Sequence, residues 1–218
     1  MPERIASAGK FVAVIIFAAL AGGVQWACTS PPSSQTEKGK PMEQEKLVAV
    51  IETTLGTIEA ELYPLDAPKT VENFVGLAGQ NYFNGVIFHR VVPGFVIQGG
   101  DPTGTGSGGR SIWGKEFADE LNPAAGSYKT GYMKGVLAMA NRGPNTNTSQ
   151  FFIMLEDNRS LPKSYTIFGR VIKGMDVVDA IGAVPLKGGM GPDASKPVTP
   201  VVMKEVRIQR PGALPAKN

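Results

Sequence analysis

The chain has 218 residues, with 22 Lys and Arg against 19 Asp and Glu and a net charge of +3. This small excess of positive charge does not indicate binding to nucleic acid, so we expect no nucleic-acid partner. There is one histidine, His89, and one cysteine, Cys28, and no acidic cluster surrounds His89. The composition argues against a zinc site and a Cys-His catalytic pair, so we expect no metal and no cofactor and take His89 as structural.

Residues 1–28 form a predicted targeting segment. Basic residues precede an apolar run over 11–27, the pattern of a secretory signal, and the run is shorter than the roughly 20 residues of a membrane-spanning helix. It ends at Cys28, which resembles the lipidation site of a bacterial lipoprotein, although Gln25 stands where an aliphatic residue is usual. A lipidated Cys28, a plain cleaved signal and an uncleaved anchor remain open. All three place the domain outside the cytoplasmic membrane, in the periplasm or cell envelope.

A tether, one folded domain and a tail follow. Residues 29–46 have almost no large apolar side chain, so burial cannot offset their ordering entropy. Residues 47–210 hold strand and helix patterns without an internal repeat, and we expect one monomeric domain there. Residues 211–218 are predicted to be a loose tail.

The domain opens with a predicted hairpin and a helix. Residues 47–51 are apolar and 57–62 alternate apolar with acidic side chains, which predicts two antiparallel strands. Asp66 is a candidate cap for a helix with Pro68 in its first turn and its end at Gly79. The helix side chains predicted to face the core are Val71, Phe74, Val75 and Ala78.

Residues 88–101 combine β-branched and aromatic side chains with one arginine, Arg90. The run predicts strand, and Pro93-Gly94 divides it into two short strands or one kinked strand. Arginine is rarely buried without a partner. Two interpretations of Arg90 are open: a strand-edge side chain in water, or a fixed hydrogen-bond donor in a dry pocket walled by Phe95.

The second half of the domain alternates short strands with turn-rich loops. Strands are predicted over residues 136–140, 151–153, 165–171 and 201–208. A short helix is predicted over 176–181, with Val177, Ala180 and Ile181 facing inward. The glycine-rich run 104–109 matches a dinucleotide-binding pattern only in its letters, because no helix follows it, so we predict a loop. Many short strands and two distant helices predict a mainly β, closed antiparallel barrel.

Residues 83–101 and 137–153 form two long motifs in a fixed order. Together they resemble the two signatures of the cyclophilin family of peptidyl-prolyl isomerases, and the resemblance covers about residues 47–210. It implies a closed eight-stranded antiparallel β-barrel capped by two α-helices, and isomerase activity on proline-containing polypeptides. The chain looks like the bacterial type, because Tyr165 stands where cyclosporin-sensitive members have histidine, and we expect weak cyclosporin binding.

An arginine, amides and aromatic side chains suit a reaction in which no bond is made or broken. An X-Pro bond rotates slowly because resonance gives it double-bond character. A donor that binds the prolyl nitrogen of the twisted state more tightly than the planar isomers accelerates rotation. We predict that Arg90 is this donor, and that Gln98 orients Arg90 or holds the substrate carbonyl.

The resemblance implies two sets of site residues. The catalytic set is Arg90, Gln98 and Phe95. The substrate-binding set is Val96, Ala140, Asn141, Gln150, Phe152, Leu161 and Tyr165. The apolar members would form a proline pocket, and Ala140, Asn141 and Gln150 would hold the peptide backbone by strand addition. Neighbouring strand residues point to opposite faces, so one of Phe151 and Phe152 must be core. The resemblance implies that Phe152 faces the substrate and Phe151 the interior.

Substrate preference and the function itself both have further interpretations. Arg142 follows Asn141 where a small residue is common in the family, which favours acidic substrates. The alternative function is a non-catalytic peptide-binding or chaperone lipoprotein on the same fold, and an adhesin-like surface lipoprotein is a third. Arg90, Phe95 and Gln98 weigh against a pure binder, which has no need of the arginine.

Overall fold

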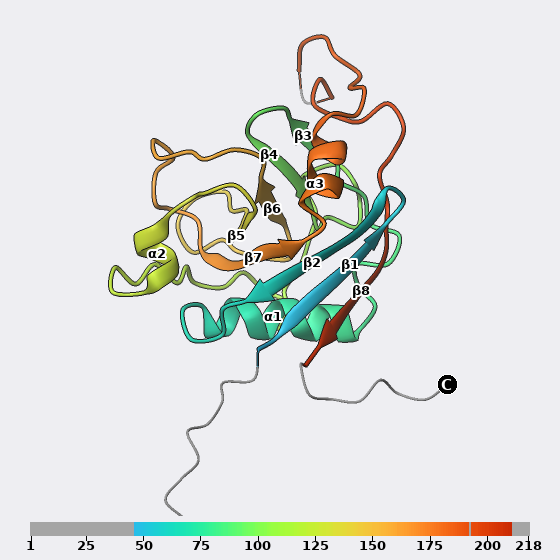
Figure 1. The fold of residues 1–218 in the computed structure, drawn as a ribbon. Helices are drawn as coiled ribbons and strands as arrows, with labels where there is room; N and C mark the ends of the chain where they lie inside the picture. Colours follow the sequence, from blue (N-terminus) through green and yellow to red (C-terminus); the bar gives the residue numbers. More distant parts are fainter. Residues whose placement is uncertain (1–45, 192, 211–218) are drawn as a thin grey trace, which may run out of the picture. The chain divides into compact units, whose positions relative to one another are not determined.

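The computed structural model describes residues 46–191 and 193–210 (Figure 1). The predicted targeting segment with Cys28, the tether up to residue 45, and the tail 211–218 lie outside the described residues. In the part that the structure describes, no helix is both long enough and apolar enough to cross a membrane.

Eight antiparallel strands form one sheet, which confirms the predicted mainly β class. The strands are β1 (Val48–Thr53), β2 (Gly56–Leu62), β3 (Arg90–Val92), β4 (Val96–Gly99), β5 (Val136–Met139), β6 (Phe151–Met154), β7 (Ile167–Lys173) and β8 (Met203–Gln209). Their spatial order is β3-β4-β6-β5-β7-β2-β1-β8, so β3 and β8 are the two ends of the sheet. The predicted hairpin is β1–β2, with Thr53 paired to Gly56 at its turn.

The two ends of the sheet meet through the segments that precede β3 and β8. Ile87 pairs with Val202 as an isolated bridge. Gly85 N–H donates to the Met203 carbonyl and Met203 N–H donates to the Val86 carbonyl, both across 2.8 Å. These bonds curl the sheet and satisfy edge groups that would otherwise be open.

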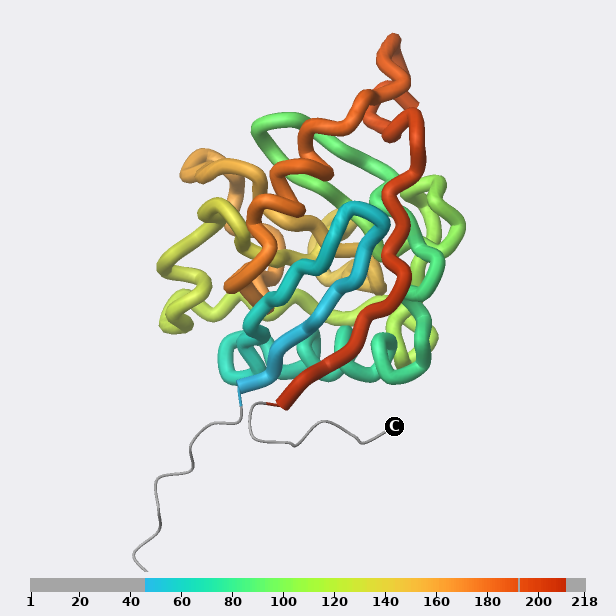
Figure 2. The backbone as a smooth tube through the Cα atoms, turned by 45° about the vertical axis from the view of Figure 1, so that its right-hand side comes forward, coloured from blue at the N-terminus to red at the C-terminus, as the bar shows by residue number. Residues whose placement is uncertain are grey.

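Helix α1 (Pro68–Gly79) lies across one end of the curled sheet, and α3 (Met175–Gly182) packs near the other (Figures 1 and 2). Pro68 occupies the first turn as predicted, but Asp66 is not the cap: the capping residue is Ala67, without a side-chain bond. A third helix, α2 (Gly126–Thr130), was not predicted, because five residues are too few for a hydrophobic period.

The predicted inward faces of the helices need two corrections. In α1, Leu77 is buried while Val75 is only partly covered. In α3, Val178 is fully buried and Ala180 is exposed, so the helix is rotated relative to the prediction. A helix of only two turns has too few apolar residues to fix its phase from sequence.

The buried side chains form two groups. The main core inside the sheet is rich in aromatic rings: Phe74, Phe83, Phe88, Phe151 and Phe168. A smaller apolar cluster of buried residues, which we call the outer cluster, consists of Val96, Tyr132, Val136, Ala138, Phe152, Met154 and Ile167. Phe151 belongs to the core and its neighbour Phe152 to the outer cluster. The two rings lie on opposite faces as strand alternation predicts, and Phe151 is the interior one as the resemblance implies.

Candidate active site

The β3–β4 hairpin places Arg90 directly opposite Gln98. The hairpin turn is closed by Phe95 N–H, which donates to the Val92 carbonyl across 2.9 Å, and Gly94 has a φ of 72° that favours glycine. The interrupted run is therefore two short strands. Arg90 Nη1 donates to Gln98 Oε1 across 3.2 Å.

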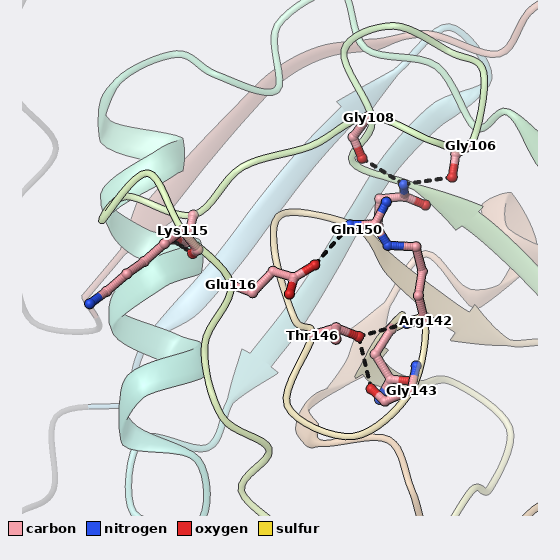
Figure 3. Close-up of polar contacts among 10 residues, drawn as sticks. Gly106, Gly108, Lys115, Glu116, Arg142, Gly143, Thr146 and Gln150 are labelled. Atoms are coloured by element: carbon pink, nitrogen blue, oxygen red, sulfur yellow. Dashed lines mark hydrogen bonds and ion pairs between the residues drawn. The ribbon is translucent and has the colours of Figure 1, made fainter.

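A polar relay continues from Gln98 to the glycine-rich loop (Figure 3 shows its last step). Gln98 Nε2 donates to Gln150 Oε1 across 2.9 Å. Gln150 Nε2 donates to the carbonyls of Gly106 at 3.0 Å and Gly108 at 2.7 Å. Because a carbonyl can only accept, these two bonds fix which way the Gln150 amide faces, and so which way Gln98 faces. The Gln98 oxygen is thereby turned toward Arg90.

Asp101 holds the glycine-rich loop in place. Its carboxylate is fully buried and accepts backbone N–H bonds from Thr103 at 2.8 Å, Gly106 at 2.7 Å and Gly108 at 3.1 Å. Burial raises the pKa of Asp101, but the hydrogen bonds from Thr103, Gly108 and Gly106 together outweigh it and bring the pKa below its ordinary value. The same loop carbonyls that orient Gln150 are thus anchored on a buried anion.

The apolar side of the site is the outer cluster and the side chains packed against it. Partly buried residues that join it include Phe95, Ala140, Leu161 and Tyr165. The rings of Phe152 and Tyr165 meet edge to face with centroids 5.5 Å apart. Tyr132 Oη donates to the Tyr165 carbonyl and accepts from the Tyr165 N–H, both at 3.0 Å. Burial raises the pKa of Tyr132 to about 12, so this brace keeps its proton.

The polar relay and the outer cluster share one face of the sheet. Arg90 pairs with Gln98, Gln98 pairs with Phe152, and Phe152 pairs with Ala138, in four neighbouring strands. Paired residues of antiparallel strands point to the same side. A guanidinium, an amide and an aromatic ring therefore stand in one row.

A small pocket adjoins this row on the side of the 141–148 loop. It is lined by Gln98, Gly106, Gly108, Ala140, Asn141, Arg142, Thr146, Thr148 and Gln150. Asn141 Nδ2 donates to the Ser164 carbonyl across 2.9 Å, so its side chain is used within the protein. Arg142 Nη2 contacts Glu116 Oε1 at 2.8 Å on the rim of the pocket (Figure 3).

The family model for cyclophilin type peptidyl-prolyl cis-trans isomerases matches residues 48–208, almost the whole described domain. The chain belongs to this family. Its cyclophilin-type domain is 49% identical over 160 residues to peptidyl-prolyl cis-trans isomerase-like 1 of Neurospora crassa, covering 73% of this chain and 93% of that protein. It is 54% identical over 134 residues to peptidyl-prolyl cis-trans isomerase ppi1 of Schizosaccharomyces pombe, covering 62% and 84% of the two chains.

A solved cyclophilin structure has the same fold. It is the cyclophilin type peptidyl-prolyl cis-trans isomerase of Cryptosporidium parvum, crystallised in the presence of the dipeptide Ala-Pro. The TM-score is 0.67 at 37% sequence identity, over 74% of this chain and 98% of that one. The relatives named here are eukaryotic, so they lend no support to the bacterial type.

The cyclophilin-type domain brings the predicted site residues into two adjoining groups. The polar group contains Arg90, Gln98 and Gln150, and Asn141 borders its pocket. The apolar group contains Phe95, Val96, Ala140, Phe152, Leu161 and Tyr165. Their roles toward a substrate stay predictions. Of the predicted residues, Cys28 alone lies outside the described part of the chain.

Sequence reasoning missed two residues that support the candidate site. Tyr132 braces Tyr165 from 33 positions away, and no local pattern reports such a contact. Asp101 holds a loop within seven positions of itself, and the available clue was a buried-strand end followed by Thr and several glycines.

His89 lies beneath the glycine-rich loop and is 4% exposed. In the described residues neither ring nitrogen has a hydrogen-bond partner. Burial lowers the pKa of His89, so the ring is neutral at pH 7. Residues 46–191 and 193–210 contain no group of three side chains suited to hold a metal ion.

Proposed function

We propose that this domain accelerates rotation about X-Pro bonds by hydrogen-bonding the twisted imide through Arg90, with no covalent step. The observation that carries the proposal is the row of Arg90, Gln98 and Phe152, where a charged donor stands beside an apolar surface. A proline ring is apolar, and its nitrogen gains a free lone pair as the bond twists. A site for the twisted state needs both features, which is differential binding of a transition state.

The polar relay holds the Arg90 guanidinium in one orientation. A guanidinium carries five N–H donors, and the bond to Gln98 uses only one nitrogen. A donor that is held in advance costs no reorganisation when charge develops in the reaction. An acceleration of about 10⁵ needs about 7 kcal/mol of preference for the twisted state. One well-placed donor supplies about 3–4 kcal/mol of this, and the apolar surface and backbone contacts supply the rest.

The proposal is tested by Arg90→Ala in the full chain, with Arg207→Ala as a matched control on β8, where the side chain pairs with Glu52. We expect Arg90→Ala to lower kcat/KM for a neutral proline tetrapeptide about 10²–10³-fold, with an unchanged melting temperature. Arg90→Lys should recover little, because an ammonium lacks the planar fork. Undiminished turnover by a folded Arg90→Ala protein would exclude this mechanism.

The rival function gives a different pattern. A peptide-binding or chaperone module would bind proline peptides in the wild type and isomerise none of them. Binding measured by titration calorimetry, beside turnover measured by exchange spectroscopy on the same peptide, separates the two. Binding without turnover in the wild type would replace the enzyme by the binder.

The proposal extends to where the domain acts: on exported proteins, held to a membrane through lipidated Cys28. Its support is the basic start, the apolar run 11–27 and the position of Cys28 after it. In a bacterial host, the full chain should take up radioactive fatty acid, and Cys28→Ala should abolish the label. A labelled Cys28→Ala protein, or an unlabelled wild type, would refute lipidation at Cys28. The proposed isomerase activity would be unaffected.

A further inference from the structure

A basic hollow of about 440 Å³ lies next to the outer cluster. It is lined by Lys129, Thr130, Gly131, Tyr132, Met133, Asn158, Arg159, Leu161 and Lys163. Three of these residues are cations and none is a carboxylate. Helix α2 and the loop between β6 and β7 form its walls, at the edge of the domain away from β8 (Figures 1 and 2). We call it the basic hollow.

Two of its cations are not neutralised within the domain. Among the described residues, the side chains of Lys129 and Arg159 have no ion-pair or hydrogen-bond partner. The third, Lys163, donates to the Tyr128 carbonyl and lies 4.5 Å from the Tyr128 ring centroid, but no carboxylate of the described residues pairs with it.

Elsewhere among the described residues, six cations form ion pairs with carboxylates, while others, such as Lys69, Lys115 and Lys204, form none. Lys134 meets Asp179 at 2.9 Å, and Lys173 meets Glu59 at 2.9 Å. The nearest carboxylate in sequence to Arg159, that of Asp157, accepts the Lys134 backbone N–H and does not line the basic hollow. What distinguishes the basic hollow is that three cations line one concave site without a carboxylate among them, which favours an anionic ligand.

One turn joins the basic hollow to the proposed proline site. Asn158 Oδ1 accepts the N–H of Ser160 at 3.1 Å and of Leu161 at 3.0 Å, and Asn158 N–H donates to the Tyr132 carbonyl at 2.8 Å. This turn carries Arg159 into the basic hollow. Its Leu161 both lines the hollow and packs against the outer cluster. A polypeptide bound with its proline on the outer cluster would reach the basic hollow by passing Leu161.

We propose that the basic hollow binds an anionic side chain of the substrate polypeptide, close in sequence to the isomerised proline. The inference rests on the proposed function and names its substrate class: acidic or phosphorylated proline segments. Asp, Glu and phosphorylated Ser or Thr share the chemistry, and the phosphate binds more tightly because it carries nearly two charges. A membrane surface is disfavoured, since Leu161 makes the hollow continuous with the peptide site rather than a separate patch.

The test uses the full chain and a set of proline hexapeptides that differ at one position, scanned through the positions before and after the proline. The residue at the varied position of the hexapeptide is Gln, Lys, Glu or phosphoserine. For the wild type at low salt, kcat/KM should rise about fivefold from Gln to Glu at one or two adjacent positions, and further for phosphoserine. The advantage should shrink as salt rises, because exposed charges are screened.

Charge reversal identifies the residues responsible. Arg159→Glu should reduce the Glu-to-Gln ratio of kcat/KM to one or below, whereas Lys204→Glu on β8, an exposed cation outside the hollow, should leave the ratio unchanged. An equal loss with Lys204→Glu, or an unaltered ratio with Arg159→Glu, would overturn the inference. A second contrary result concerns membranes. If Arg159→Glu abolished binding to vesicles of anionic lipid but left the Glu-to-Gln ratio of kcat/KM unchanged, the hollow would bind lipid and the inference would be wrong. A wild type inactive on every peptide would instead refute the proposed function.

Discussion

Two rows of side chains cross the same four strands, one residue apart, and face opposite sides of the sheet. The inner row is fully buried in the main core and consists of Val91, Ile97, Ile153 and Leu137. The outer row consists of Arg90, Gln98, Phe152 and Ala138. The register that packs one row therefore positions the other, and a shift by one residue would exchange core and site.

The two rows obey different rules. The inner row is aliphatic throughout, and other apolar side chains of similar volume would fill it at small cost in stability. The outer row needs particular groups: a fork of donors, an amide held in one orientation, and a ring. We therefore expect inner-row changes to alter the free energy of unfolding and outer-row changes to alter turnover.

The largest expected effect is on the inner row. Leu137→Ala removes a fully buried side chain and leaves a cavity, so the free energy of unfolding should fall by about 2–5 kcal/mol. Urea titration measures this loss. At a temperature where the variant is folded, kcat/KM should stay within about twofold of the wild type. If Leu137→Ala lowered kcat/KM as much as Arg90→Ala does, the expectation that inner-row changes affect stability rather than turnover would be wrong.

The next effect is on the outer row. Gln98→Leu keeps the volume but removes the acceptor that holds Arg90 and the donor to Gln150. A hydrogen bond to a charged group is worth about 1.5–3 kcal/mol, so kcat should fall about tenfold to a hundredfold. Gln209→Leu, an exposed glutamine on β8, is the control. If Gln98→Leu changed stability more than turnover, the relay would be structural only.

A smaller effect is the pH dependence of the free energy of unfolding that buried His89 causes. The folded-state pKa of His89 lies below the unfolded value because burial disfavours the imidazolium. The unfolded state then binds more protons as pH falls below about 6.5, so stability is lost by up to about 1.4 kcal/mol per pH unit until the folded pKa is reached. His89→Leu should flatten this slope between pH 7 and pH 5 in urea titrations. An equally steep slope in the variant would assign the acid sensitivity to other groups.

Local patterns in the sequence carry much of this arrangement. Composition predicts strand on both sides of Pro93-Gly94 but leaves open one kinked strand or two short ones, and the structure shows the β3–β4 hairpin that brings Arg90 opposite Gln98. Strand alternation separates Phe151 from Phe152. These features are readable because each depends on residues only a few positions apart.

Contacts between distant segments escape the sequence. Asp66 looks like a helix cap, but its carboxylate instead accepts the N–H of Ser127, 61 positions away. Tyr132 holds Tyr165 by bonds that no periodicity records. The basic hollow is assembled from α2 and the β6–β7 loop, and its charge is visible only once these segments are side by side.

The smallest effect concerns Arg142, which extends the outer side beyond the row. Its ion pair with Glu116 is exposed on both sides, so Glu116→Gln should change stability by less than about 1 kcal/mol. The sequence-based expectation is that Arg142 favours acidic substrates, and Glu116 competes for the same guanidinium. Glu116→Gln should therefore raise the Glu-to-Gln ratio of kcat/KM at the peptide position that Arg142 contacts. Arg142→Ala should lower the ratio at that position to one.

This preference is separable from that of the basic hollow because the two sites flank the row at different places. Arg142 borders the pocket beside Gln98 and Gln150, whereas Arg159 lies beyond Leu161. A bound chain runs in one direction, so the glutamate position sensitive to Arg142→Ala should differ from the one sensitive to Arg159→Glu. If one peptide position responded to both variants, the charges would act as a diffuse field, and neither pocket would read a particular side chain.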